Sequence, residues 1–170
     1  LRNDKSGSSY VAPPLTAMGA IAVVVNYPLI RSATLDVLVH SARTAVAWAH
    51  HNAAAFGGDP QRITVSGHSA GGHLAAMVLA SDWTSLGLPA GLVRAACAVS
   101  GLYDLEPVRL CSQNTALGLD RETAHRNSPA LQRAPVGARL LLAVGATEGP
   151  EFHRQARALE QAWGGAGMAV

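Results

Sequence analysis

The sequence GHSAG at positions 67–71 is the feature that most constrains what this chain can fold into. It lies between a short β-branched run at 62–66 and an apolar stretch at 73–80 that favours a helix. A G-x-S-x-G sequence between a strand and a helix is typical of a sharp turn that lifts a serine hydroxyl clear of the backbone. Side chains two residues before and two residues after that serine would collide, which explains Gly67 and Gly71. The alternative interpretation is a glycine-rich strand–helix turn with an incidental serine.

Ser69 is therefore the candidate nucleophile of this turn. The N–H of Ala70, at the start of the following helix, can donate to a negative charge that develops on a substrate oxygen. A serine used in this way needs a base to accept its proton and an acid to orient the base. A serine hydrolase site at Ser69 would therefore need two further side chains, an acid and a base.

Two carboxylates are candidates for the acid. Glu148 directly follows the predicted strand 139–144, at the edge of the sheet where such a site lies. Asp104 follows the predicted strand 93–100 and is the competitor. In this chain order the acid follows a later strand than the nucleophile does, and we favour Glu148 because it comes straight after the fourth predicted strand. A solvated loop carboxylate is the alternative for either residue.

The base is harder to assign, because no histidine follows a strand that comes after Glu148. His68 adjoins Ser69 on the wrong side of the turn, and His153 opens the last predicted helix only five residues after Glu148. We expect the base to lie outside this sequence. The seven histidines of the chain are His40, His50, His51, His68, His73, His125 and His153.

Strands and helices alternate along the chain, which predicts an α/β fold with a mostly parallel sheet and helices on both faces. The predicted strands are 20–26, 62–66, 93–100 and 139–144, with a fifth beginning at 168. The predicted helices are 34–56, 73–80 and 151–163. Residues 1–16 are expected to form a loop and a short helix, and 108–137 an irregular segment. We interpret residues 1–170 as one domain.

Composition and charge exclude several classes of protein. The chain is 49% hydrophobic and 14% charged with a net charge of +2, which argues against disorder and against a nucleic-acid partner. The longest apolar stretch, 17–25, is too short to cross a bilayer, so we expect no membrane. Cys97 and Cys111 have no metal-like spacing, and reduced thiols in the cytoplasm are the expected state. We assign no metal and no cofactor, and we leave a homodimer open.

Longer stretches of the sequence resemble a known family. The segment 67–75 (GHSAGGHLA) resembles the nucleophile elbow of α/β-hydrolase esterases. Three further segments are similar to arylformamidases, also called kynurenine formamidases: 100–107 (SGLYDLEP), 127–129 (NSP) and 144–155 (VGATEGPEFHRQ). The resemblance implies an α/β-hydrolase fold, with Ser69 as nucleophile and Glu148 where the family has its Asp or Glu.

The resemblance also implies missing parts. The family's His-Gly-Gly oxyanion loop would precede Leu1, and its catalytic histidine would follow Val170. The chain therefore resembles the central part of such an enzyme, with an incomplete sheet that lacks flanking strands. We expect a serine hydrolase that converts N-formylkynurenine or a similar aryl formamide to an amine and formate. The alternatives are a carboxylesterase of small acyl esters and a non-catalytic fragment.

Overall fold

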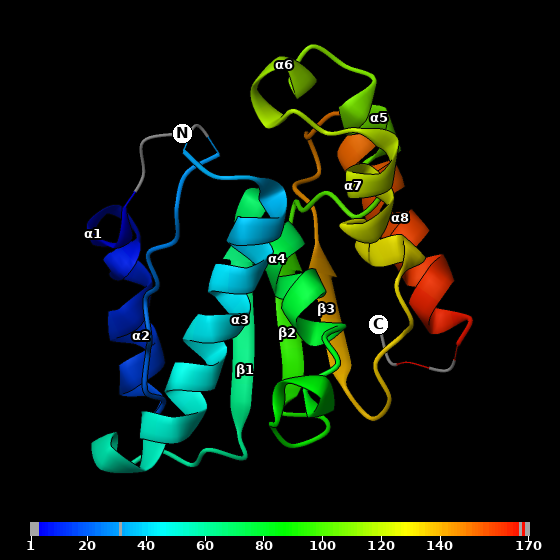
Figure 1. Cartoon of the computed structure of the whole chain (residues 1–170). Coiled ribbons are helices and arrows are strands. Elements are labelled where there is room, and N and C mark those ends of the chain that lie inside the picture. The colour runs from blue at the N-terminus through cyan, green and yellow to red at the C-terminus, as the bar shows by residue number, and fades with distance from the viewer. Residues whose placement is uncertain (1–3, 31, 167, 169–170) are drawn as a thin grey trace.

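A three-stranded parallel sheet forms the centre of the molecule (Figure 1). The computed structural model describes residues 4–30, 32–166 and 168. The strands are β1 (Ile63–His68), β2 (Val93–Val99) and β3 (Arg139–Ala143), in the order β1-β2-β3. They confirm three of the predicted strands, which are rich in the apolar residues that pack well on a covered sheet face.

Three long helices accompany the sheet: α3 (Leu35–Asn52), α4 (Ala70–Leu79) and α8 (Pro150–Gly164). The hydroxyl of Thr34 caps α3 by accepting from the N–H of Val37 at 3.4 Å. A 3₁₀ turn, η2 (Ala53–Phe56), extends this helix to Gly57, whose φ of 78° ends it. All three predicted helices are thus present.

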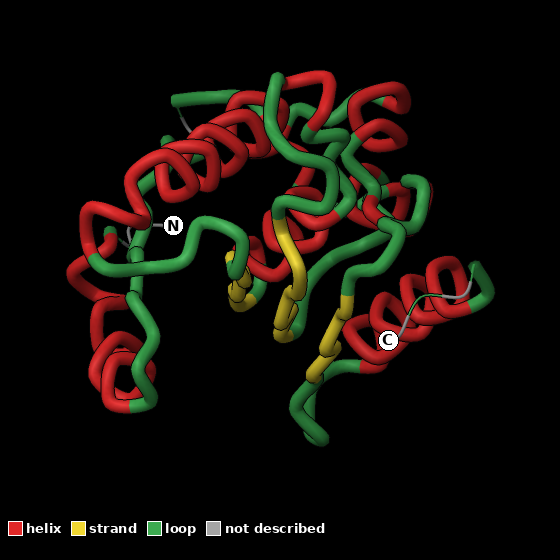
Figure 2. The backbone as a smooth tube through the Cα atoms, turned by 90° about the horizontal axis from the view of Figure 1, so that it is seen from below, coloured by secondary structure: helices red, strands yellow, loops and turns green. Residues whose placement is uncertain are grey.

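The helices α3, α4 and α8 lie on one face of the sheet, whereas we expected helices on both faces (Figure 2). The reason is the strand order. A right-handed crossover places its connection on the same side of the sheet whenever the next strand is added in the same direction. The order β1-β2-β3 never reverses, which accounts for α4, the helix between β1 and β2. Among the described residues no long helix covers the opposite face. On that face Leu141 is 61% exposed.

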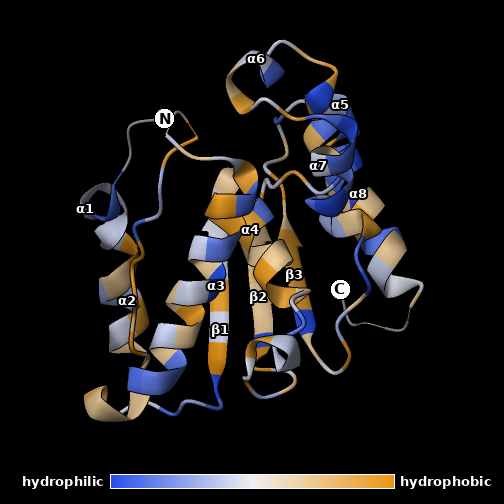
Figure 3. Ribbon diagram, in the orientation of Figure 1, coloured by the Kyte–Doolittle hydropathy of each residue, from blue (hydrophilic) through white to orange (hydrophobic). Residues whose placement is uncertain are grey.

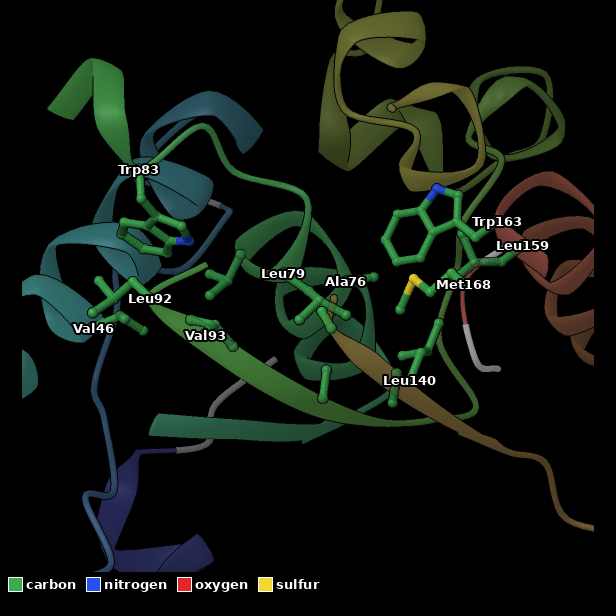
Figure 4. Packing of buried hydrophobic residues seen from close by; sticks show 14 of the residues in the cluster. Val46, Ala76, Leu79, Trp83, Leu92, Val93, Leu140, Leu159, Trp163 and Met168 are labelled. Carbon is green, nitrogen blue, oxygen red and sulfur yellow. The ribbon is translucent and has the colours of Figure 1, made fainter. Parts of the chain in front are cut away.

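The core lies between this sheet face and the helices (Figure 4). The indole of Trp83 packs at one end near Val46 and Leu92, and the indole of Trp163 packs at the other end near Met168 (Figure 4). Apolar residues are concentrated on the strands and on α4 (Figure 3). These buried residues fix the position of α4, which begins directly after the candidate nucleophile Ser69.

The predicted strand 20–26 is wrong. The described structure has no strand before β1, and the exposed fractions of Ile21 and Val23 are 46% and 47%. The segment instead runs back beside α1 (Lys5–Ser8), η1 (Ser9–Val11) and α2 (Ala12–Ala17), where the N–H of Lys5 donates to Asn26 Oδ1 at 2.6 Å. β-branched residues favour a strand only where a neighbouring strand supplies the ladder, and none pairs with this segment.

A long excursion, residues 101–137, connects β2 to β3 above the carboxyl ends of the strands (Figure 1). Sequence reasoning expected irregular structure over most of it, but several short helices form. The 3₁₀ turn η3 (Thr84–Leu86) lies between α4 and β2. The predicted strand at 168–170 falls largely outside the described residues. The short helices are α5 (Glu106–Arg109), α6 (Asn114–Leu117), α7 (Arg121–Arg126) and η4 (Pro129–Leu131).

None of the helices in the described ranges combines the length and the apolar character needed to cross a membrane.

Candidate active site

Ser69 connects β1 to α4 in a conformation that residues with a side chain rarely adopt. Its φ is 56° and its ψ is −117°, and the residue is exposed. The N–H of Ser69 donates to the carbonyl oxygen of Val99 at 2.9 Å, while its own carbonyl accepts the N–H of His73 at 3.1 Å. The turn is therefore held on one side by β2 and on the other by the first turn of α4. Strain at an exposed serine is characteristic of functional sites.

The two glycines of the motif play different parts. A Cβ atom on Gly67 would lie 2.3 Å from both the carbonyl carbon and the oxygen of Gly71, far inside contact distance. A Cβ atom on Gly71 would meet no atom of the described residues within 4 Å. The sequence interpretation gave both residues the same steric role. Of these two residues, only Gly67 is sterically required to be glycine, because the backbone of Gly71 occupies the place of its Cβ atom.

Gly72 is a residue of this turn that sequence reasoning missed. A Cβ atom there would lie 2.9 Å from the oxygen of Val99 and 3.1 Å from the Cα of Gly101. The start of α4 therefore packs directly against the end of β2. The sequence signal for this role is that Gly72 directly follows Gly71, the last glycine of the motif.

Ala70 is the first residue of α4. The N–H groups in the first turn of a helix have no acceptor within the helix and carry partial positive charge. The N–H of Ala70 belongs to this set and directly follows Ser69 in the chain.

Glu148 lies after β3 and is held by two donors on one carboxylate oxygen. Its Oε2 accepts from the hydroxyl of Ser100 at 2.6 Å and from the N–H of Gly145 at 2.9 Å. These donors, the Ser100 hydroxyl first, hold the pKa of Glu148 below its ordinary value, and the nearby rings of His68 and His153 act in the same direction. The group is a carboxylate at neutral pH.

Asp104 is engaged elsewhere. Its Oδ2 forms an ion pair with Arg154 of α8 at 3.1 Å, and its Oδ1 accepts the N–H of Glu106 at 3.2 Å. The fully buried Gln155 binds the same loop, because its Oε1 accepts the N–H groups of Tyr103 and Asp104 at 2.7 Å each. These contacts give Asp104 a structural role in fastening the loop to α8.

The end of β2 connects the candidate nucleophile and the candidate acid. Val99 accepts the amide of Ser69, and the next residue, Ser100, donates its amide to Ala143 at 2.7 Å and its hydroxyl to Glu148. The structure therefore brings Ser69 and Glu148 to the same carboxyl edge of the sheet.

The histidines do not complete this pair within the described residues, because no imidazole ring forms a hydrogen bond with the side chain of Ser69 or of Glu148. His73 is buried in α4, where its Nε2 lies 2.7 Å from the oxygen of Asn127, and burial lowers its pKa. His50 in α3 contacts the oxygen of Pro60 at 3.0 Å. His68 is exposed at the end of β1, and His153 is half-buried in α8.

In the part of the chain that the structure describes, no three His, Cys, Asp or Glu side chains gather as metal ligands would. Cys97 is half-buried and Cys111 exposed, and both are free thiols.

A parallel sheet whose strand enters a helix through a strained serine, with a carboxylate after a later strand, defines the α/β-hydrolase class. The match to a family model is more specific. The BD-FAE family model matches residues 1–123, and the chain belongs to this family.

Related proteins agree with this class. The chain is 34% identical to a kynurenine formamidase from Danio rerio over the whole chain and 33% identical to one from Salmo salar over 89% of the chain. It spans 57% and 51% of the lengths of these two proteins. It also shares 36% identity with the esterase LipQ of Mycobacterium tuberculosis over 54% of the chain, which is 23% of LipQ.

Solved structures show the same fold. A protein from Silicibacter sp. TM1040 described as a candidate thioesterase superposes with a TM-score of 0.82 and 30% identity, over 96% of this chain and 60% of its own. An esterase from Pyrobaculum calidifontis superposes with a TM-score of 0.77 and 21% identity, over 99% of this chain and 59% of its own.

Proposed function

We propose that this chain is the central part of a serine hydrolase of the arylformamidase type, with residues 1–170 as one domain. The observation that carries the proposal is the strained conformation of Ser69, φ 56° and ψ −117°, at the strand–helix turn. The similarity to kynurenine formamidases over the whole chain supports the substrate class. The substrate would be N-formylkynurenine or a similar aryl formamide, and the products an amine and formate.

In the proposed reaction the Ser69 oxygen attacks the formyl carbon while a histidine base accepts the hydroxyl proton. The Ala70 N–H donates to the oxyanion of the tetrahedral intermediate. The C–N bond then breaks, and the amine leaves with the proton from the base. Water, activated by the same base, attacks the formyl ester of Ser69 and releases formate.

Glu148 orients the base and stabilises its positive charge in this scheme. The low pKa of Glu148 supports the role, because the group must be ionised when the imidazolium forms. We place the base and a second oxyanion donor outside these 170 residues.

Activity measurements on the 170-residue chain and on the longer natural protein, each with and without Ser69→Ala, test this proposal. The substrates are N-formylkynurenine and p-nitrophenyl acetate. We expect hydrolysis by the longer protein, its loss on Ser69→Ala, and very low activity of the 170-residue chain. Ser69-dependent turnover at the full rate by the short chain would mean that one of its own histidines is the base.

A carboxylesterase of small acyl esters is the second candidate, and the 36% identity with LipQ favours it. The two functions share Ser69, Ala70 and Glu148 and differ in the acyl group and in the leaving group. A higher kcat/KM for p-nitrophenyl acetate than for the formamide would favour the esterase. A non-catalytic module is the third candidate, and inactivity of the longer protein on both substrates would favour it.

We further propose a cytoplasmic enzyme with a small-molecule substrate, able to form a homodimer. The free thiols of Cys97 and Cys111 support a reducing compartment. Light scattering after size-exclusion chromatography measures the oligomeric state, and fractionation of the source cells tests the location.

A further inference from the structure

Ser100 shares an unusual backbone conformation with Ser69. These two serines are the only non-glycine residues with a positive φ among the described residues, and the φ of Ser100 is 49°. Glycine occupies this region with less strain. The side chain of Ser100 is only 3% exposed, although it carries a hydroxyl. A buried polar residue in a strained conformation next to a candidate site points to a specific use of its hydroxyl.

The hydroxyl of Ser100 donates to Oε2 of Glu148 at 2.6 Å, and the N–H of Gly145 donates to the same oxygen at 2.9 Å. Gly145 allows this approach, since a Cβ atom there would lie 3.3 Å from the Cγ of Glu148. Among the described residues, no donor forms a hydrogen bond with Oε1. One carboxylate oxygen is thus fixed, and the other is left to accept a hydrogen bond.

An acid that orients a histidine base needs this arrangement. One oxygen must accept from the imidazole N–H, and the carboxylate must not rotate away from it. The residue before Ser100, Val99, holds the amide of Ser69 at 2.9 Å. The end of β2 therefore sets the position of both the nucleophile and the acid.

We propose that Ser100 is a positioning residue of the active site, whose hydroxyl fixes Oε2 of Glu148 so that Oε1 faces the base. This inference rests on the proposed function and adds to it a residue that acts through Glu148. The proposed role requires the hydroxyl of Ser100, and a residue that merely tolerates the positive φ would not fulfil it.

The test uses Ser100→Ala and Ser100→Gly in the longer natural protein. Both variants lack the hydroxyl, but the glycine also relieves the backbone strain. We expect kcat to fall about 10-fold or more in both, as is common when a hydrogen bond to a charged group is lost. KM should stay within about twofold, because Ser100 does not touch the substrate. The pKa of Glu148, followed by NMR of ¹³C-labelled glutamate and assigned with Glu148→Gln, should rise in both variants.

Ser128→Ala is the matched control. Ser128 is also buried, and its hydroxyl donates to the oxygen of Ala124 at 2.7 Å and accepts the N–H of Leu105 at 2.8 Å. This variant should lower the thermal stability and leave the pKa of Glu148 as in the unmodified protein. A structural role of Ser100 alone would make Ser100→Ala behave in the same way.

The proposal is overturned if the pKa of Glu148 is unchanged in Ser100→Ala, or if Ser100→Gly retains full kcat. Failure of the proposed function has a different signature, because it appears as full activity of Ser69→Ala or as inactivity of the unmodified longer protein. In that case the pKa of Glu148 in the Ser100 variants still decides whether the hydroxyl holds the carboxylate.

Discussion

The imidazole Nε2 of His73 lies 2.7 Å from the main-chain oxygen of Asn127, 54 residues further along the chain. This contact joins α4, which follows Ser69, to the excursion between β2 and β3. The Asn127 side chain donates to Asp36 of α3 at 2.8 Å, and Arg126 forms an ion pair with the same carboxylate at 2.7 Å. Asn127 is therefore the junction of two helices and the excursion.

This junction should make stability depend on pH. Burial lowers the pKa of His73 below the ordinary value of 6.5. As the pH falls below 6.5, the unfolded chain binds a proton that the folded chain does not, so stability is lost on acidification. His73→Gln keeps an amide donor for Asn127 but does not titrate. Urea unfolding at pH values above and below 6.5 should show a smaller loss of stability on acidification for this variant than for the unmodified chain.

His125→Gln, at an exposed position of α7, is the control and should keep the original pH dependence. Equal pH dependence of His73→Gln and the unmodified chain would contradict the explanation.

The strand–helix turn should tolerate alanine at one glycine only. Gly67→Ala places a Cβ atom 2.3 Å from the backbone of Gly71, and we expect a loss of about 3 kcal/mol or more in the free energy of unfolding. Gly71→Ala has room in α4 and should stabilise the helix by about 0.5–1 kcal/mol. Chemical denaturation measures both, and equal effects would show that the two positions are sterically alike.

The end of the core near α8 should be sensitive to cavities. Leu159 is fully buried, and Leu159→Ala should lower the free energy of unfolding by about 2–5 kcal/mol. Leu141→Ala removes the same atoms from a side chain that is 61% exposed, and it should change stability by about 0.5 kcal/mol or less. Thermal or urea unfolding of the two variants side by side gives the comparison. Similar losses would indicate that Leu141 is covered in solution.

Substitution of the two competing carboxylates should separate their roles. In the longer natural protein, Glu148→Gln should lower kcat about a thousandfold or more, because the amide no longer stabilises the imidazolium. Asp104→Asn should weaken the ion pair with Arg154 and lower stability, with little effect on kcat. Steady-state kinetics on N-formylkynurenine decides between them, and the reverse ranking would move the acid to Asp104.

The sequence predicted the parts of the fold that local patterns determine. The strands at β1, β2 and β3 and the helices α3, α4 and α8 each have an apolar pattern of matching period and clear end signals such as Thr34 and Gly57. The elbow was predictable because its geometry depends on a contact between residues four positions apart, Gly67 and Gly71.

Features that depend on distant partners were missed. The run at 20–26 has the composition of a strand, but no strand lies beside it, and sequence composition does not report on neighbours. The contacts of Ser100 with Glu148 and of His73 with Asn127 join residues that are 48 and 54 positions apart. No local period or motif encodes such pairs.

The excursion between β2 and β3 has a consequence for how such a molecule can diversify. Gln155 of α8 binds its first residues, Asp36 of α3 binds Asn127 in its second half, and Ser128 binds Leu105 across it. Leu110 lies between these contacts and is 69% exposed. Insertions or exchanges around Leu110 would leave these fastenings intact. A segment grafted there from a relative would change the surface above the carboxyl ends of the strands while Ser69 and Glu148 kept their places. Under the proposed function, new substrate preferences can therefore arise in this chain independently of the chemistry.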